Sequence, residues 1–140
     1  MACVPSDLKY SGNHEWVRPL GNGRVRMGIT EYAQKKLGDP VYVQLPAAGS
    51  RWDAGDNFGY VESVKSINDL YLPVAGTIAA VNESLQESHF GAEHIANDSY
   101  GDGWIAEVTL ANPTDLKGLL TPTDYEKLIN QQGWRLSRNR

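Results

Sequence analysis

The chain has 140 residues, of which 41% are hydrophobic and 21% are charged, with a formal net charge of −4. This length suits one domain around one hydrophobic core, so we expect residues 1–140 to form a single domain. The composition is that of a globular chain. The negative charge argues against nucleic-acid binding, which usually needs a basic face.

Location follows from the same kind of evidence. Cys3 is the sole cysteine, so no intramolecular disulfide can form, which favours a reducing compartment. No apolar run is long enough to cross a membrane, and residues 1–7 lack the pattern of a secretory signal. We therefore expect a cytoplasmic protein without a membrane partner, or one of the mitochondrial matrix if a transit peptide has been removed.

Short runs of alternating apolar and polar residues, separated by glycine and proline, dominate the chain. They predict strands at 25–29, 41–45, 58–64, 70–72, 76–81 and 104–110. Gly21-Asn22-Gly23 is a hairpin turn signal rather than a phosphate loop, since no helix with the required motif follows. Many short strands between turns predict a mainly β sandwich or barrel, with its core at about 23–110.

Helices are few in this pattern. Thr30 is a typical N-cap and Gly38 a typical stop for a short helix between them. Thr121 followed by Pro122 opens a C-terminal helix, which we expect to end at Gly133. Leu116, Leu119 and Leu120 suggest a further turn upstream, so the helical segment covers about 113–133. The basic tail 134–140 is expected to fray.

The most informative stretch lies between the strands expected at 58–64 and 70–72. It contains Lys65, followed by Asn68 and Asp69, whose side chains favour turns. The pattern therefore predicts that Lys65 lies at or beside an exposed hairpin tip. Exposed lysines in turns are common, so the hairpin alone assigns no function.

The neighbours of Lys65 carry a resemblance. Glu62 lies three residues before the lysine and Gly76 lies eleven residues after it, a spacing similar to that of lipoyl and biotinyl carrier domains. Biotinyl domains usually have methionine on both sides of the lysine, where this chain has Val64 and Ser66. Lipoyl domains of 2-oxoacid dehydrogenases favour aspartate directly before it. Glu-Ser-Val-Lys instead resembles the glycine cleavage system H proteins.

The resemblance to H proteins extends along most of the chain. The matching blocks are 8–10, 14–17, 28–34, 37–39, 41–46, 54–56 and 100–104. Three features depart from the family pattern: a longer stretch at 86–99, Ser99 in place of a common proline, and Asn13 where some members have serine.

The resemblance implies a fold. We expect a flattened β-sandwich, or barrel-sandwich hybrid, of the lipoyl/biotinyl carrier type, with short peripheral helices and a C-terminal helix. Its two antiparallel sheets would be related by approximate two-fold symmetry. The Lys65 hairpin would lie at one end, and the opposite reversal near residues 45–49.

The resemblance also implies a function. Lys65 would carry lipoic acid as an amide, and the chain would be a non-catalytic carrier; for a diffusing shuttle of this kind we expect a monomer. It would take an aminomethyl group from a pyridoxal-phosphate glycine decarboxylase to a tetrahydrofolate-dependent aminomethyltransferase. An FAD-containing dihydrolipoamide dehydrogenase would reoxidise it. A lipoyl ligase or transferase would recognise Glu62 and Gly76.

An aminomethyl group on a lipoyl sulfur decomposes in water to formaldehyde and ammonia, so a cleft that excludes water would protect it. Its ammonium needs acceptors, and carboxylates are the strongest. Glu15 and Asp69 match cleft acids of the family and are assigned this role. The alternative is that Glu15 is a solvated surface charge and Asp69 a turn former.

Other functions remain open from the residues. One is a lipoyl relay or a regulatory H-like carrier that serves other lipoate-dependent systems. Another is a β interaction module with Lys65 unmodified, and a third is a biotin carrier. His89 and His94 are five residues apart and would not share a helix face, so no metal site is expected. His14 is expected to pack or hydrogen-bond beside Trp16.

Overall fold

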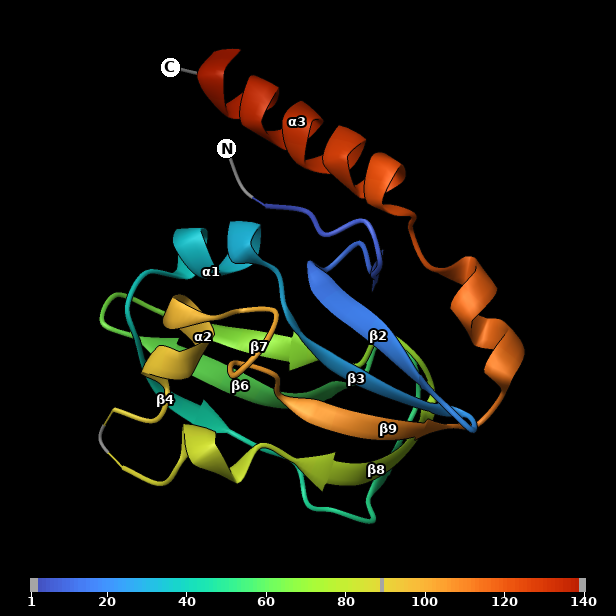
Figure 1. The fold of residues 1–140 in the computed structure, drawn as a ribbon. Helices are drawn as coiled ribbons and strands as arrows, with labels where there is room; N and C mark the ends of the chain where they lie inside the picture. Colours follow the sequence, from blue (N-terminus) through green and yellow to red (C-terminus); the bar gives the residue numbers. More distant parts are fainter. Residues whose placement is uncertain (1–2, 89, 139–140) are drawn as a thin grey trace.

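The computed structural model describes residues 3–88 and 90–138, and the side chains of residues 3–88 and 90–131 (Figure 1). The strands are β1 (Lys9–Tyr10), β2 (Glu15–Gly21), β3 (Arg24–Ile29), β4 (Pro40–Gln44), β5 (Arg51–Trp52), β6 (Asn57–Ser63), β7 (Ile67–Tyr71), β8 (Gly76–Val81) and β9 (Ala106–Leu110). The helices are α1 (Glu31–Leu37), α2 (Glu93–Asn97) and α3 (Pro122–Arg138), with two 3-10 turns, η1 (Glu83–Leu85) and η2 (Pro113–Gly118).

The strands form two antiparallel sheets, which confirms the mainly β prediction. One sheet has the order β1-β2-β3-β9-β8-β5, and the other has the order β4-β6-β7. Within the described residues both sheets are open, and they are unequal in size. A hydrophobic core that extends from Val17 to Leu110 draws on both sheets, so it begins somewhat before the expected limit of residue 23. No helix in the described part of the chain is long and apolar enough to span a membrane.

A second, smaller core joins the two ends of the chain. It contains Leu8, Tyr10, Trp16, Tyr125 and Ile129. The backbone of Tyr10 exchanges two hydrogen bonds with Leu120, of 2.7 and 3.0 Å, directly before α3 begins. In Figure 1, α3 accordingly runs past the N-terminal segment at the top of the molecule. The start of the C-terminal helix is therefore anchored on β1.

All six predicted strands are present, but β1, β2 and β5 were not predicted. The pattern of β2 is concealed because Glu15, Trp16 and Val17 are all buried, so its first half shows no alternation of apolar and polar residues. The strands β1 and β5 have two residues each, too few to show a period. The short helix α2 was also not predicted.

The helix starts follow the sequence signals. The Thr30 hydroxyl accepts a hydrogen bond from the Ala33 N–H, and Gly38 ends α1 with φ of 85°. The Thr121 hydroxyl likewise accepts from the Asp124 N–H at 3.1 Å. The predicted stop at Gly133 is wrong, since α3 continues to Arg138. A single glycine costs a helix only about 1 kcal/mol relative to alanine, and no proline follows. Residues 139–140 lie outside the described residues.

The two reversals of the chain lie where they were expected. Because β4 is antiparallel to β6, Pro40 pairs with Ser63 beside the Lys65 turn, and Gln44 pairs with Tyr60 farther away. The reversal after β4 therefore lies away from the lysine. There the Ser50 N–H donates to the Ala47 carbonyl, and the chain crosses from the small sheet to β5 in the large one.

Candidate functional site

Lys65 is exposed in the turn between β6 and β7. The buried Ser63 side chain organises this turn: its hydroxyl accepts hydrogen bonds from the N–H groups of Lys65 (3.3 Å) and Ser66 (3.1 Å). The Ser63 N–H donates to the Ser66 carbonyl at 2.8 Å. The turn is thus closed from within, and Lys65 lies at its tip as predicted.

A second element supports the tip from outside the hairpin. The Val64 N–H donates to the Asp39 carbonyl at 3.1 Å, just after α1. The Lys65 side chain crosses Gly38, where an added Cβ would lie 3.2 Å from the lysine Cε. Gly38 also has a left-handed backbone that side chains rarely adopt. The end of α1 therefore helps to hold the lysine in place.

The expectation that Asn68 and Asp69 belong to the turn is wrong. Both residues lie in β7, where Asn68 pairs with Val61 and Asp69 pairs with Tyr60. The serine hydrogen bonds close the turn before Ile67, so strand pairing resumes earlier than the side-chain preferences of Asn68 and Asp69 suggest.

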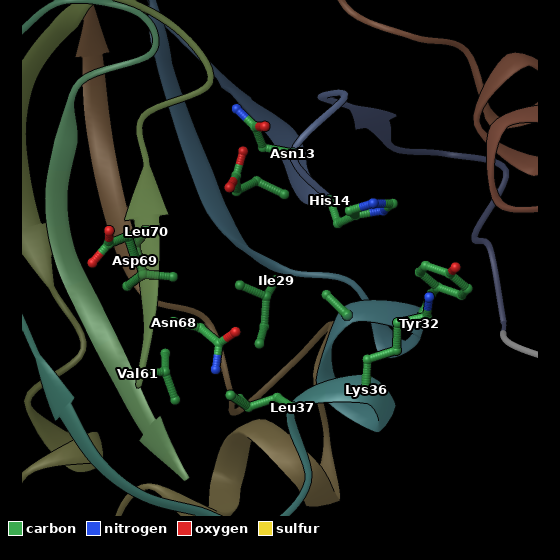
Figure 2. Close-up of a pocket in the computed structure, with 12 residues that line it drawn as sticks. Asn13, His14, Ile29, Tyr32, Lys36, Leu37, Val61, Asn68, Asp69 and Leu70 are labelled. Carbon is green, nitrogen blue, oxygen red and sulfur yellow. The ribbon is translucent and has the colours of Figure 1, made fainter. Parts of the chain in front are cut away.

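A cleft of about 240 Å³ opens beside this hairpin. Its walls come from three parts of the fold: the residues around the start of β2, one side of α1, and the β6–β7 strands (Figure 2). The lining residues are Asn13, His14, Glu15, Ile29, Tyr32, Ala33, Lys36, Leu37, Val61, Asn68, Asp69 and Leu70. Both acids assigned from the sequence border this one cleft.

Glu15 is the buried acid of the cleft, only 2% exposed. Its carboxylate accepts a hydrogen bond of 2.5 Å from the Ser11 hydroxyl, and it forms no ion pair within the described residues. Burial raises the pKa of Glu15 from 4.5 to about 7, although the Ser11 hydroxyl and the Tyr71 and Glu15 backbones oppose the rise. A cation in the cleft would therefore meet a carboxylate that has no other cationic partner.

Asp69 has a different environment. Asn68 and Asp69 are both exposed, but side chains alternate along a strand, so Asn68 lies on the same side of β7 as the buried Leu70 and Asp69 lies on the opposite side. Figure 2 shows the Asn68 side chain pointing toward Leu37 and Asp69 pointing to the other side of β7. Asn68 was not identified from the sequence because it was interpreted as a turn former.

On the α1 side, Tyr32 and Lys36 border the cleft one helical turn apart. The Lys36 ammonium lies 4.7 Å from the centre of the Tyr32 ring, a cation–π distance. Their (i, i+4) spacing on a helix was readable in the sequence. That spacing does not indicate that this side of the helix faces a cleft.

The two residues assigned to recognition lie in different places. Glu62 is half-buried on β6 and pairs with Tyr42 on one side and Ile67 on the other, close to the tip. Gly76 begins β8 in the other sheet, where an added Cβ would lie 2.2 Å from the Thr109 carbonyl oxygen. The close approach of β9 is thus a structural reason for glycine at that position.

The histidines considered in the sequence form no metal site among the described residues, and His14 has a structural contact instead. The His14 ring nitrogen Nδ1 is 2.8 Å from the Tyr125 hydroxyl, whereas the Trp16 indole donates to the Ser99 carbonyl. The His14 side chain therefore hydrogen-bonds to α3, and its ring also packs on Tyr32 and Tyr125. His89 lies outside the described residues, and within them no group of His, Cys, Asp and Glu is arranged to hold a metal ion.

Comparison with known proteins gives consistent results. The family described as Glycine cleavage H-protein matches residues 8–132. The chain is 48% identical over 133 residues to a glycine cleavage system H protein of Carboxydothermus hydrogenoformans, covering 95% of this chain and 99% of the relative. It is 46% identical over 132 residues to that of Chromohalobacter salexigens, covering 94% of this chain and 98% of the relative.

A solved structure agrees in sequence and in fold. The crystal structure of a glycine cleavage system H protein from Mycobacterium marinum matches with a TM-score of 0.76 and 37% identity, covering 93% of this chain and 99% of that one. The chain therefore belongs to the glycine cleavage H-protein family, the lipoyl carriers of the glycine cleavage system.

Proposed function

We propose that Lys65 is the residue of this chain that carries lipoic acid, as an amide, and that Glu15 receives the loaded end of the arm in the cleft. One observation supports this above all: an exposed lysine at a hydrogen-bonded turn lies beside a cleft that contains a buried carboxylate without an ion-pair partner among the described residues. The chain itself is then a non-catalytic carrier, because the reactive sulfurs belong to the cofactor.

The cleft lies along the path that a flexible arm on Lys65 would take. Asn68 is three residues further along the chain and therefore at most about 10 Å from Lys65 along the backbone, the length of three fully extended residues. An aminomethyl ammonium docked in the cleft would have the Glu15 carboxylate as its charged acceptor. The apolar side chains of Ile29, Leu37 and Leu70 would limit the access of water to it.

The partners follow from membership of the family. We propose the pyridoxal-phosphate glycine decarboxylase, the tetrahydrofolate-dependent aminomethyltransferase and the FAD-containing dihydrolipoamide dehydrogenase of the glycine cleavage system. A lipoyl ligase or transferase would load Lys65. The relatives described above are bacterial, which supports the cytoplasm as the place of these reactions. We propose a monomer, the form suited to a diffusing carrier.

The experiment is intact-mass measurement after incubation with a lipoyl ligase, ATP and lipoic acid. The parent should gain one lipoyl group and Lys65→Arg none, with both chains showing the same far-UV circular dichroism, because an exposed side chain contributes little to packing. Lys117→Arg, an exposed lysine outside the cleft, is the matched control and should gain lipoate normally. Lipoate on Lys65→Arg would assign another lysine as the carrier. A biotinyl mass in protein isolated from its host would refute the lipoyl proposal.

A further inference from the structure

The clearest feature that the proposed function does not use lies behind the cleft, where α3 begins. Tyr125, in the first turns of α3, is fully buried. Its hydroxyl lies 2.7 Å from the Thr30 hydroxyl and 2.8 Å from His14 Nδ1. These partners are 95 and 111 positions away in the chain.

Each of the two partners belongs to a different wall of the cleft. Thr30 is the N-cap of α1, the helix that lines one side. His14 directly precedes Glu15, and both line the side formed by the start of β2. The Thr30 N–H also donates to the His14 carbonyl at 3.0 Å. One phenol thus joins the two walls at the point where their backbones meet.

The backbone of His14 requires such support. Its φ is 70°, a left-handed conformation that is uncommon for residues other than glycine and that persists where surrounding contacts impose it. Figure 2 shows the His14 ring directed away from Asn68, on the side of Tyr32, with whose ring it is in contact. The contact with Tyr125 therefore lies on the rear side of the segment that presents Glu15.

The Tyr125 hydroxyl can form hydrogen bonds with both of its neighbours at once. Burial raises the pKa of Tyr125 above its ordinary value, so the hydroxyl keeps its proton. A neutral phenol can donate one hydrogen bond and accept another, which satisfies Thr30 and His14 together. The ring is held in turn by Tyr10, which stacks on it at 4.6 Å with an angle of 8° between the planes.

We propose that the Tyr125 hydroxyl is a positioning group that clamps the two walls of the cleft together and thereby holds Glu15 in place. The C-terminal helix then acts on the cleft without lining it. Whether this clamp also retains a loaded lipoyl arm rests on the proposed function of Lys65 and Glu15. The effect of the clamp on the position of the two cleft walls does not depend on that function.

The chain offers a matched pair of variants. Tyr125→Phe removes the clamping hydroxyl and keeps the stacked ring. Tyr10→Phe removes the hydroxyl of the other ring in the same stack, whose partner is the Pro5 carbonyl at 2.6 Å. Both tyrosines are fully buried, so the general cost of losing a buried hydroxyl is alike. Only the first change releases Thr30 and His14.

The first measurement is amide hydrogen exchange on the unmodified chain. The Thr30 N–H, bonded to His14, should exchange about fivefold faster in Tyr125→Phe than in Tyr10→Phe, the factor typical of one hydrogen bond. The N–H of Leu110, at the end of β9, donates to the Gly23 carbonyl. It should exchange at the same rate in both variants and serves as the internal control. Equal Thr30 rates in the two variants would overturn the proposal.

The second measurement uses the lipoylated and aminomethylated chain. Loss of formaldehyde should be faster in Tyr125→Phe than in Tyr10→Phe, with equal incorporation of lipoate. Equal loss despite faster Thr30 exchange would overturn the control of the cleft by the clamp. If Lys65 accepts no lipoate, the proposed function fails, and the exchange rates alone decide on the clamp.

A second variant covers the case in which Tyr125→Phe fails to fold. His14→Asn keeps a residue that tolerates a left-handed backbone and removes the ring from Tyr125. It should raise Thr30 exchange in the same way. Where both variants fold, their effects on Thr30 exchange should be less than additive, because both changes remove the His14–Tyr125 contact, while Tyr125→Phe also releases Thr30 and His14→Asn also removes the ring contact with Tyr32. Additive effects would refute the clamp.

Discussion

Glu15→Gln tests the cleft through the stability of the empty carrier. The unfolded chain loses the Glu15 proton near pH 4.5, whereas the folded chain keeps it to about pH 7. Between these values the folded state binds the extra proton, so the stability of the parent falls as pH rises. At about 1.4 kcal/mol per pH unit, the total loss is about 3 kcal/mol. Glutamine has nearly the same shape and no charge, so this loss should disappear in the variant.

The assay is urea denaturation of the parent and of Glu15→Gln at several pH values between 4 and 8. The difference in unfolding free energy should shift by about 3 kcal/mol in favour of the variant as pH rises through this range, and it should level off above the folded pKa. The hydrogen bond from the Ser11 hydroxyl favours the ionised carboxyl and is therefore already included in the folded pKa, whereas the loss of hydrogen bonds that the protonated carboxyl also makes adds only a constant offset. A difference that does not change with pH would show that Glu15 is solvated and that the cleft contains no buried carboxylate.

The result bears on function as well as on stability. A carboxylate that destabilises the empty protein at neutral pH is stabilised once a cation is buried beside it, because the attraction between the two charges offsets part of the cost of their desolvation. The buried Glu15 carboxylate lowers the stability of the empty carrier, and we expect docking of the aminomethyl ammonium to restore part of that stability.

Three further substitutions separate packing from recognition. Gly76→Ala should destabilise the fold by about 1–3 kcal/mol or more in urea denaturation, because its Cβ would meet the Thr109 carbonyl at 2.2 Å; parental stability would contradict the observed closeness of β8 and β9. Glu62→Ala should leave the unfolding free energy within about 0.5 kcal/mol of the parent and slow lipoylation, and an unchanged rate would exclude Glu62 from recognition. Asp69→Asn should accelerate formaldehyde loss from the loaded carrier less than Glu15→Gln does, because Asp69 lies on the side of β7 opposite to the buried Leu70; an equal or larger effect would mean that its carboxylate turns into the cleft.

Local patterns in the sequence were sufficient for much of the fold. The alternating runs placed β3, β4, β6, β7, β8 and β9, because each of these strands has one buried and one more exposed face over part of its length. The caps at Thr30 and Thr121 placed the starts of α1 and α3, since a capping hydrogen bond involves only residues three positions apart. Lys65 was placed at a hairpin tip for the same reason: the turn and its two strands are contiguous in the chain.

The sequence could not show features that depend on distant contacts. Burial on both faces concealed the first half of β2, and with it the position of Glu15 inside the protein. Asn68 and Asp69 have side chains that favour turns, yet pairing with β6 placed them in a strand and on opposite sides of it. The steric reason for Gly76 lies in β9, more than thirty residues away.

The sequence by itself therefore determined the family, the mainly β class and the lysine at the tip, because each of these depends on short local patterns and on their order along the chain. Only the tertiary structure decided what surrounds that lysine. The cleft exists because α1, the start of β2 and the β6–β7 hairpin meet in space, and its rear contact joins Tyr125 to residues about a hundred positions earlier. Packing sets which carboxylate is buried and which is solvated, and burial in turn sets the pKa of Glu15.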